Sequence, residues 1–111
     1  MKVYISGKIT DNKDYKKYFE EAAQRVRDMG EEPVVPIENG TPENQDLWKK
    51  WEDYLKKDIK ILMDCDAIYL ICENIAGVGK GWKESRGAIF EKDIAERLNY
   101  NIMYSDPEKK F

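Results

Sequence analysis

Short apolar runs alternate along the chain with longer segments whose apolar residues recur at the spacing of an amphipathic helix. The short runs predict strands at residues 2–6, 33–37, 67–72 and 101–104. The longer segments predict three helices, which end near Met29, Met63 and Leu98. This alternation of strand and helix indicates an α/β domain built on a parallel sheet.

Capping residues set the expected starts of the first two helices. Asp11 or Asn12 is suited to cap the first helix, and Gly30 should end it. The second helix is expected to run from Pro42, because Thr41 supplies a capping hydroxyl and proline is favoured at the first helical position.

The connections between the strands predict a specific architecture. Right-handed crossovers between parallel strands favour a flavodoxin-like, half-Rossmann three-layer sandwich with strand order 2-1-3-4 and helices on both faces. Pro33 and Pro36 lack amide donors, so the second strand should lie at an edge. We expect residues 1–111 to form a single domain. In this strand order the loops after Ser6 and Cys72 meet at one crevice, where open parallel sheets bind ligands.

The second and third helices each carry one charged residue within an apolar face. Asp58 interrupts the stripe of the second helix, which consists of Leu47, Trp48, Trp51, Tyr54, Leu55, Ile59 and Leu62. Glu91 lies within the arc of the third helix, which consists of Gly87, Ala88, Phe90, Ile94, Ala95 and Leu98. Burial of a carboxylate is costly unless the group is paired or used. Either residue could be a structural group bonded to a neighbouring loop or lysine, but both can point toward the same strand ends.

Composition restricts the chemistry of such a site. The chain has no histidine, which leaves carboxylates, tyrosine, lysine, serine or cysteine for catalysis. A net charge of −3 without a long block of like charges argues against a nucleic-acid-binding surface. We find no signal peptide and no apolar run long enough to span a membrane. Cys65 and Cys72 are expected to be buried free thiols on opposite faces of the third strand, in a reducing, cytoplasmic compartment.

A loop with three glycines, at residues 73–83, precedes the third helix. A strand, a glycine-rich loop and a helix N-terminus together can hold an anionic or polar ligand. The glycines could equally be turn residues, and Ser85 is most simply an N-cap.

Several motifs together resemble a known superfamily. They are the segment Tyr4-Ile5-Ser6-Gly7-Lys8-Ile9, Asp58 on the second helix, the strand Asp66-Ala67-Ile68-Tyr69-Leu70, and the spacing Ser85-x-Gly87-x-x-x-Glu91. In this order they resemble the nucleoside 2-deoxyribosyltransferase superfamily. The segment Gly81-Trp82-x-x-Ser85-Arg86-Gly87-Ala88 with Glu91 is more closely similar to the small DUF4406 proteins of that superfamily.

The resemblance implies retaining cleavage of the N-glycosidic bond of a 2′-deoxynucleoside or its 5′-monophosphate, by hydrolysis or by transfer to another base. It favours the 2′-deoxynucleoside 5′-monophosphate, because members of the superfamily that act on monophosphates carry a serine at the position of Ser85. Glu91 would be the nucleophile that forms a glutamyl-deoxyribosyl intermediate. Tyr4 matches the tyrosine that orients this nucleophile, and Asp58 matches the acid that protonates or anchors the leaving base. Asp66 resembles a strand-entry aspartate that we interpret as structural.

The resemblance also implies the substrate contacts. Gly7, Lys8 and Ile9 match the loop that borders the substrate, while Ser85 and Gly87 match the positions that hold the 5′ end of the sugar. We expect a small-molecule deoxynucleotide or nucleoside as partner, and no cofactor or metal. The alternatives are a non-catalytic nucleotide-binding or sensing module, or cleavage of another N-glycoside such as NAD.

The second helix also predicts self-association. Trp48, Trp51 and Tyr54 widen its apolar stripe beyond what a sheet of four strands needs to cover one face. We therefore expect a homodimer or a higher homo-oligomer with this helix at or near the interface.

Overall fold

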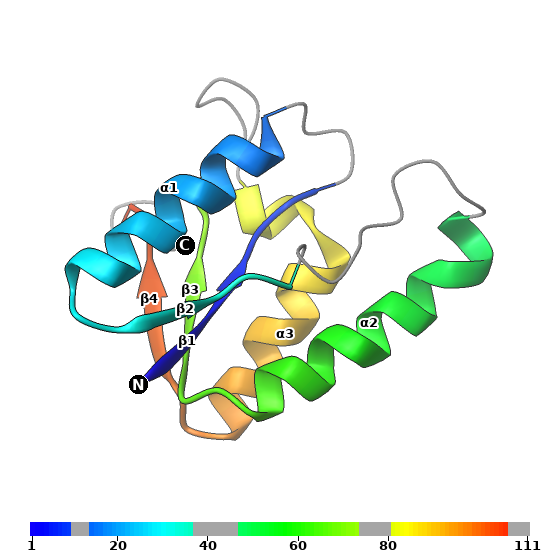
Figure 1. Cartoon of the computed structure of the whole chain (residues 1–111). Helices are drawn as coiled ribbons and strands as arrows, with labels where there is room; N and C mark the ends of the chain where they lie inside the picture. Colours follow the sequence, from blue (N-terminus) through cyan, green and yellow to red (C-terminus); the bar gives the residue numbers. More distant parts are fainter. Residues whose placement is uncertain (10–13, 37–46, 74–80, 107–111) are drawn as a thin grey trace.

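The computed structural model describes residues 1–9, 14–36, 47–73 and 81–106, and only the backbone of residues 47–54. The strands are β1 (Lys2–Ser6), β2 (Glu32–Val34), β3 (Ala67–Leu70) and β4 (Asn101–Tyr104). The helices are α1 (Tyr15–Asp28), α2 (Leu47–Met63), the short 3₁₀ helix η3 (Gly81–Glu84) and α3 (Arg86–Arg97). Figure 1 shows their arrangement.

The sheet has the predicted topology. Within the described residues, four strands pair in the order β2-β1-β3-β4, and every pair is parallel. This confirms the predicted three-layer α/β fold. The register pairs Tyr4 with Val34 on one side and with Ile68 on the other. β2 lies at an edge, as its prolines predict, and is shorter than the predicted strand.

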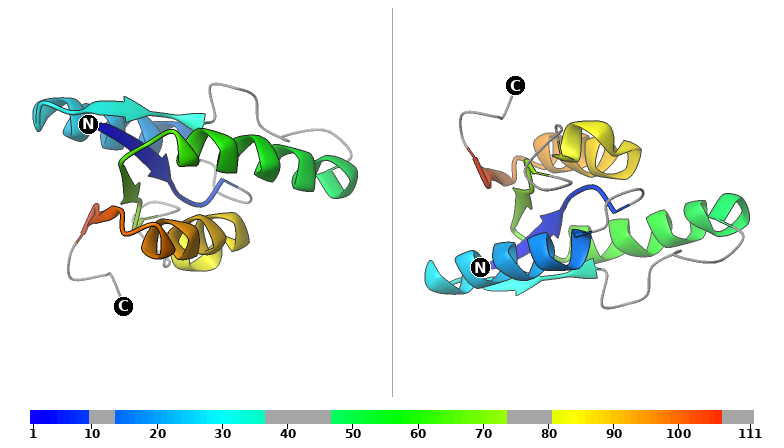
Figure 2. Two further views of the ribbon diagram at one scale, coloured as in Figure 1. Left: turned by 90° about the horizontal axis from the view of Figure 1, so that it is seen from below. Right: turned by 90° about the horizontal axis from the view of Figure 1, so that it is seen from above.

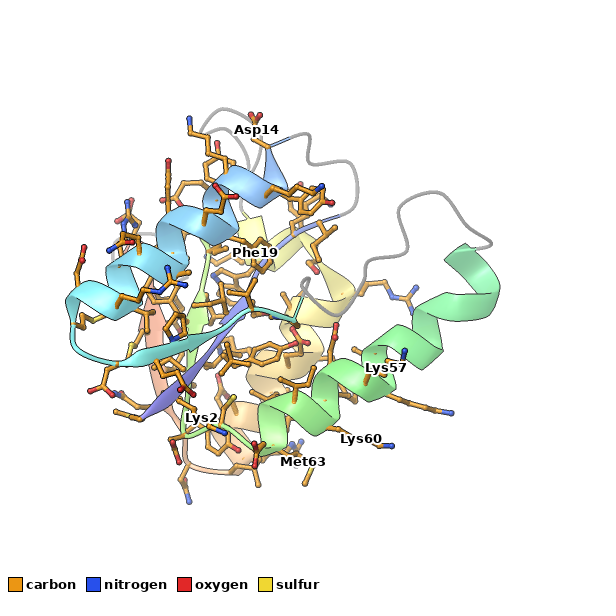
Figure 3. All side chains as sticks on the ribbon, viewed as in Figure 1. Lys2, Asp14, Phe19, Lys57, Lys60 and Met63 are labelled. Carbon is orange, nitrogen blue, oxygen red and sulfur yellow. The ribbon has the colours of Figure 1, made fainter. Side chains whose placement is uncertain are left out.

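Helices cover both faces of the sheet (Figure 2). Under α1 the core contains Val3, Ile5, Phe19, Ala22, Val26, Ala67, Tyr69 and Ile71. Phe19 points from α1 toward the sheet in Figure 3, whereas Lys57 and Lys60 project outward from α2. Under α2 and α3 the core contains Tyr4, Leu62, Cys65, Ile68, Leu70, Cys72, Trp82, Ala88 and Ala95.

The starts of the first two helices could not be predicted reliably. The N-cap of α1 is Asp14 and not Asp11 or Asn12, and the Asp14 side chain makes no capping hydrogen bond. The first helix therefore begins without the side-chain cap that we expected. Thr41 and Pro42, the predicted start of the second helix, lie outside the described residues.

α3 buries a narrower face than its periodicity predicts. Its buried residues are Ala88, Glu91 and Ala95, whereas Phe90 is 48% exposed and Leu98 is 44% exposed. The apolar arc seen in the sequence is therefore wider than the face that the core buries. The alanines contact the sheet side, and α2 lies alongside α3, so the outer part of the apolar arc has no element among the described residues to cover it.

Both cysteines lie on the same side of the sheet. Cys65 and Cys72 are buried free thiols, as predicted, but both belong to the core under α2 and α3. The predicted placement on opposite faces was wrong because β3 runs only from Ala67 to Leu70, so strand alternation does not govern either cysteine.

Gly81 brings η3 close to the carboxyl end of β3. Its φ is +52°, and a Cβ atom there would lie 2.4 Å from the carbonyl carbon of Cys72. The next residue, Trp82, is buried, and its amide donates to the carbonyl of Ile71 at 2.9 Å. Glycine is therefore required where the chain turns into the segment that leads to α3.

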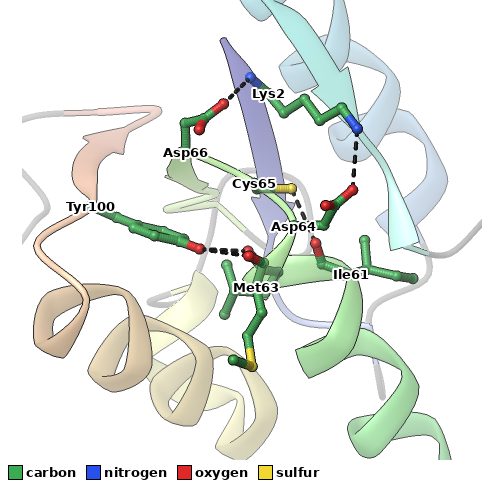
Figure 4. A network of polar contacts seen from close by, with 8 residues as sticks. Lys2, Ile61, Met63, Asp64, Cys65, Asp66 and Tyr100 are labelled. Atoms are coloured by element: carbon green, nitrogen blue, oxygen red, sulfur yellow. Dashed lines mark hydrogen bonds and ion pairs between the residues drawn. The ribbon is translucent and has the colours of Figure 1, made fainter.

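A polar network holds the opposite, amino end of the sheet (Figure 4). The Lys2 amide donates to Asp66 Oδ2 at 2.9 Å, and the Lys2 ammonium contacts Asp64 at 3.2 Å. The Tyr100 hydroxyl donates to the carbonyl of Leu62 at 3.0 Å. Asp66 thus fastens the start of β1 to the entry of β3, which agrees with the structural role that we expected for it.

Candidate active site

A buried carboxylate on α3 meets two hydroxyl groups from β1. Tyr4 and Ser6 are two positions apart, so they share the face of β1 that points to α2 and α3. The Tyr4 hydroxyl donates to Oε2 of Glu91, and the Ser6 hydroxyl donates to Oε1 at 2.8 Å. All three side chains are buried. Each carboxylate oxygen of Glu91 therefore accepts a hydrogen bond from a different side chain.

The start of α3 determines how Glu91 faces the sheet. The Ser85 hydroxyl accepts a hydrogen bond from the Ala88 amide at 3.1 Å and so caps the helix. Ala88 and Ala95 lie on the same side of the helix as Glu91, at spacings of three and four residues, and are buried. These small side chains allow α3 to lie close to the sheet, where Glu91 reaches both hydroxyls.

Burial makes Glu91 easy to protonate near neutral pH. Its pKa is raised from 4.5 to about 7, chiefly because burial removes water from the carboxylate. The hydrogen bonds from Tyr4 and Ser6 lower the pKa in part, and the nearby charge of Asp58 raises it. A carboxylate that is poorly hydrated, and held at both oxygens, is suited to act as a nucleophile.

α2 brings a second carboxyl group close to the first. Asp58 is half-buried, and burial raises its pKa from 3.8 to about 6, although Lys57 opposes this effect. The charge of Asp58 also contributes to the raised pKa of Tyr4, which lies well above 10 mainly because of burial. Tyr4 is therefore a protonated donor at neutral pH, and Asp58 is a carboxyl group that can hold or release a proton there.

The loop after β1 approaches the start of α3. The Lys8 ammonium donates to the Glu84 carbonyl at 3.2 Å, directly before the cap residue Ser85. Gly7 packs closely against Ile71, which directly follows β3, because a Cβ atom at Gly7 would lie 3.0 Å from Cβ of Ile71. Ile9 instead packs against the core under α1. Lys8 and Ser85 thus come together as the sequence suggests, whereas Ile9 lies against the other layer.

The first turn of α3 is only partly covered by the described residues. Gly87 is partly exposed, and among the described residues the nearest atom to a Cβ placed there would be Oγ of Ser85 at 3.9 Å. Ser85 is also partly exposed. Ser85, Gly87 and Lys8 therefore form a partly exposed rim at the amino end of α3.

Ser6 was missed when candidate residues were selected from the sequence. Its signal was strand alternation, because any role for Tyr4 beside the third helix also places Ser6 on that face. The predicted site residues otherwise divide into a buried group and a rim. The buried group contains Tyr4 and Glu91 with Asp58 nearby, and the rim contains Gly7, Lys8, Ser85 and Gly87.

In the part of the chain that the structure describes, histidine, cysteine, aspartate and glutamate form no cluster of three or more suited to a metal ion. None of the helices in those residues has the length and apolar character needed to cross a membrane.

The fold is shared with a nucleoside-processing enzyme. The solved structure of a 2-deoxyribosyltransferase from Bacillus psychrosaccharolyticus, described as a biocatalyst for the synthesis of nucleosides, superposes with a TM-score of 0.66. The match covers 94% of this chain and 71% of that chain, at 21% sequence identity. The two proteins therefore share the same α/β fold.

The particular family follows from the sequence. Residues 1–104 match the model of DUF4406, described as a domain of unknown function, so the chain belongs to this family. A comparison with curated protein sequences gave no match.

Proposed function

We propose that this protein cleaves the N-glycosidic bond of a 2′-deoxynucleoside 5′-monophosphate and passes the deoxyribosyl group to water or to another base. The observation that carries this proposal is the buried Glu91 carboxylate, held at Oε2 by Tyr4 and at Oε1 by Ser6. A protein that only bound a nucleotide would gain nothing from this group, because a buried carboxylate lowers stability unless it is used or compensated. The shared fold with a 2-deoxyribosyltransferase supports the same class of reaction.

In the first step Glu91 attacks C1′ of the sugar. A bond forms between a carboxylate oxygen and C1′ while the bond from C1′ to the base nitrogen breaks, and its electron pair stays with the base. Asp58, in its protonated form, gives its proton to the departing base. The negative charge of Glu91 also stabilises the oxocarbenium-like character of the transition state.

In the second step the ester is resolved. Water or a second base attacks C1′ from the side that the first base has left, and the Glu91 carboxylate is regenerated. Asp58, now ionised, accepts the proton of the attacking nucleophile, which returns it to its starting form. Tyr4 keeps its proton throughout and orients the carboxylate.

We assign the 5′-phosphate to the amino end of α3. Ser85 and Gly87 are both partly exposed in the first turn, and the Lys8 ammonium donates to the Glu84 carbonyl next to them. Together with the positive end of the helix, these groups favour an anion over a neutral sugar hydroxyl.

The direct test is release of a base. The protein is incubated with a panel of deoxynucleosides, their 5′-monophosphates, ribonucleotides and NAD, and the released base is quantified. Glu91→Ala should lower base release at least about 1,000-fold. The matched control is Glu96→Ala, which removes an exposed glutamate from the same helix and should leave the rate unchanged.

A mechanism-based label identifies the nucleophile. A 2′-fluoro-2′-deoxynucleotide should leave a sugar-phosphate mass on the peptide that contains Glu91. Full activity in Glu91→Ala would refute the mechanism. Tight nucleotide binding without release of any base would instead indicate a sensing module.

The choice of substrate is tested at the cap of α3. Ser85→Asp and Ser85→Asn both retain a good capping side chain, but only aspartate adds a negative charge. We expect wild type to favour the monophosphate over the nucleoside by about 10-fold, which is about 1.4 kcal/mol. Ser85→Asp should abolish this preference, and Ser85→Asn should retain most of it. A wild-type preference for the nucleoside, or equal behaviour of the two variants, would contradict the assignment.

A further inference from the structure

Glu91 and Asp58 must hold different numbers of protons for the proposed chemistry to begin. The nucleophile has to be ionised, and the proton donor has to be protonated. The two groups interact, since the charge of Asp58 raises the pKa of Glu91. Their titration therefore belongs to the pair, and a state with one proton can carry it on either residue.

The single proton resides mainly on the wrong residue, even with the hydrogen bonds to Glu91 in place. Glu91 is more deeply buried than Asp58, and its pKa is about 7 against about 6 for Asp58. The carboxyl group with the higher pKa retains the proton, so the form with Glu91 ionised and Asp58 protonated is the minor one. Any contact that favours ionised Glu91 raises the amount of this productive form directly.

Among the described residues, two contacts favour ionised Glu91, and both come from β1. Tyr4 donates to Oε2, and Ser6 donates to Oε1 at 2.8 Å, within a buried environment. On α2, Lys57 favours ionised Asp58 and thus acts in the opposite sense. A hydrogen bond from a neutral hydroxyl to an ionised carboxylate is among the stronger ones that a protein makes.

We propose that Ser6 is a positioning residue that, by donating its hydroxyl to Oε1 of Glu91, raises the share of the pair in which Glu91 is ionised and Asp58 carries the proton. Ser6 does not touch the reacting atoms. It acts through Glu91, by fixing the orientation of the carboxylate and by stabilising its ionised form. This inference rests on the proposed function for its catalytic consequence, but the proton distribution itself can be measured without any substrate.

The first experiment measures the proton directly. Protein labelled with ¹³C at the side-chain carboxyls of glutamate and aspartate is titrated by NMR, and Glu91→Gln and Asp58→Asn assign the two resonances. Ser6→Ala should raise the pKa of Glu91 by about one unit, which is about 1.4 kcal/mol. Ser6→Cys retains a weak donor and should give a smaller shift in the same direction.

The second experiment measures the catalytic consequence. In Ser6→Ala the maximum of kcat/KM should fall about 10-fold, because the productive form of the singly protonated pair becomes that much rarer. The alkaline limb of the pH profile should move to higher pH by about one unit, because Glu91 loses its proton later. A residue with a merely structural role would lower the rate without moving this limb.

The matched control is Ser105→Ala. Ser105 also lies at the carboxyl end of the sheet, where its hydroxyl donates to Glu73 at 2.8 Å and accepts from the Cys72 amide at 2.7 Å. Neither contact reaches Glu91, so Ser105→Ala should leave the pKa of Glu91 and the shape of the pH profile unchanged.

The outcomes separate this inference from the proposed function. An unchanged pKa of Glu91 in folded Ser6→Ala overturns the role of Ser6, whatever the activity. If the pKa of Glu91 is raised in Ser6→Ala but wild type releases no base, the role of Ser6 in the proton distribution is supported. The proposed reaction is then refuted. A raised pKa with an unmoved alkaline limb overturns the catalytic consequence.

Discussion

At the scale of single residues, Glu91 brings function and stability into conflict. Burial raises its pKa from 4.5 to about 7, so the folded protein binds this proton more tightly than the unfolded chain does. The contribution of Glu91 to stability is therefore fully present below about pH 4.5 and is lost as the pH rises through about 7. At alkaline pH the folded state contains a buried charge that the unfolded chain exposes to water.

Replacing Glu91 by glutamine should remove this penalty. Glu91→Gln keeps the shape of the side chain without the charge, so at about pH 8 the free energy of unfolding should increase by up to about 3 kcal/mol. Near pH 5 the gain should be small, because Glu91 is then protonated in the folded protein. Urea unfolding at both pH values measures the difference. A gain that is equal at the two pH values would show that charge burial is not its cause.

At the scale of elements, the turn from β3 into α3 depends on Gly81. This residue combines a φ of +52° with a close approach to the backbone of Cys72, whereas at Gly30, with a φ of +81°, no described atom would lie within 4 Å of an added Cβ. Gly81→Ala should therefore lower the free energy of unfolding by about 3 kcal/mol or more, and Gly30→Ala by about 1 kcal/mol. Denaturant unfolding of both variants tests this contrast. Equal losses of stability in the two variants would show that the clash of an added Cβ with the backbone of Cys72 costs nothing beyond the strain of a positive φ.

The sequence predicted the types and order of the elements better than their limits. Strand order 2-1-3-4 follows from right-handed crossovers and could be predicted without contacts. How far Phe90 and Leu98 are exposed could not be predicted, because their exposure depends on where α2 lies beside α3. Ser6 was missed for a related reason. Alternation places it on the correct face, but only the approach of α3 shows that it reaches Glu91.

At the scale of the whole molecule, the layer formed by α2 and α3 presents apolar surface. Phe90 and Leu98 are almost half exposed, with the partly buried Ile94 between them on the same side of α3. We predict that the protein forms a homodimer through this helical layer, with α2 at or near the interface. Light scattering at micromolar concentration should give twice the mass of the chain.

Charge introduced into the layer should weaken the dimer. Phe90→Lys and Leu98→Lys should each shift the equilibrium toward monomer, whereas the matched variant Met29→Lys, at an exposed methionine beyond α1, should not. A wild-type protein that is monomeric over this concentration range would contradict the prediction.

The network at the amino end of the sheet has a consequence for how this protein can diversify. Lys2, Asp64, Asp66 and Tyr100 fasten the elements at one end, while Ser6 contacts Glu91 about 13 Å further along β1. Changes separated by this distance, without shared partners, are nearly additive in free energy. The loops at the carboxyl ends can therefore accumulate substitutions and acquire new ligands. Meanwhile the polar network at the amino end keeps the free energy of unfolding above the threshold that a folded protein needs.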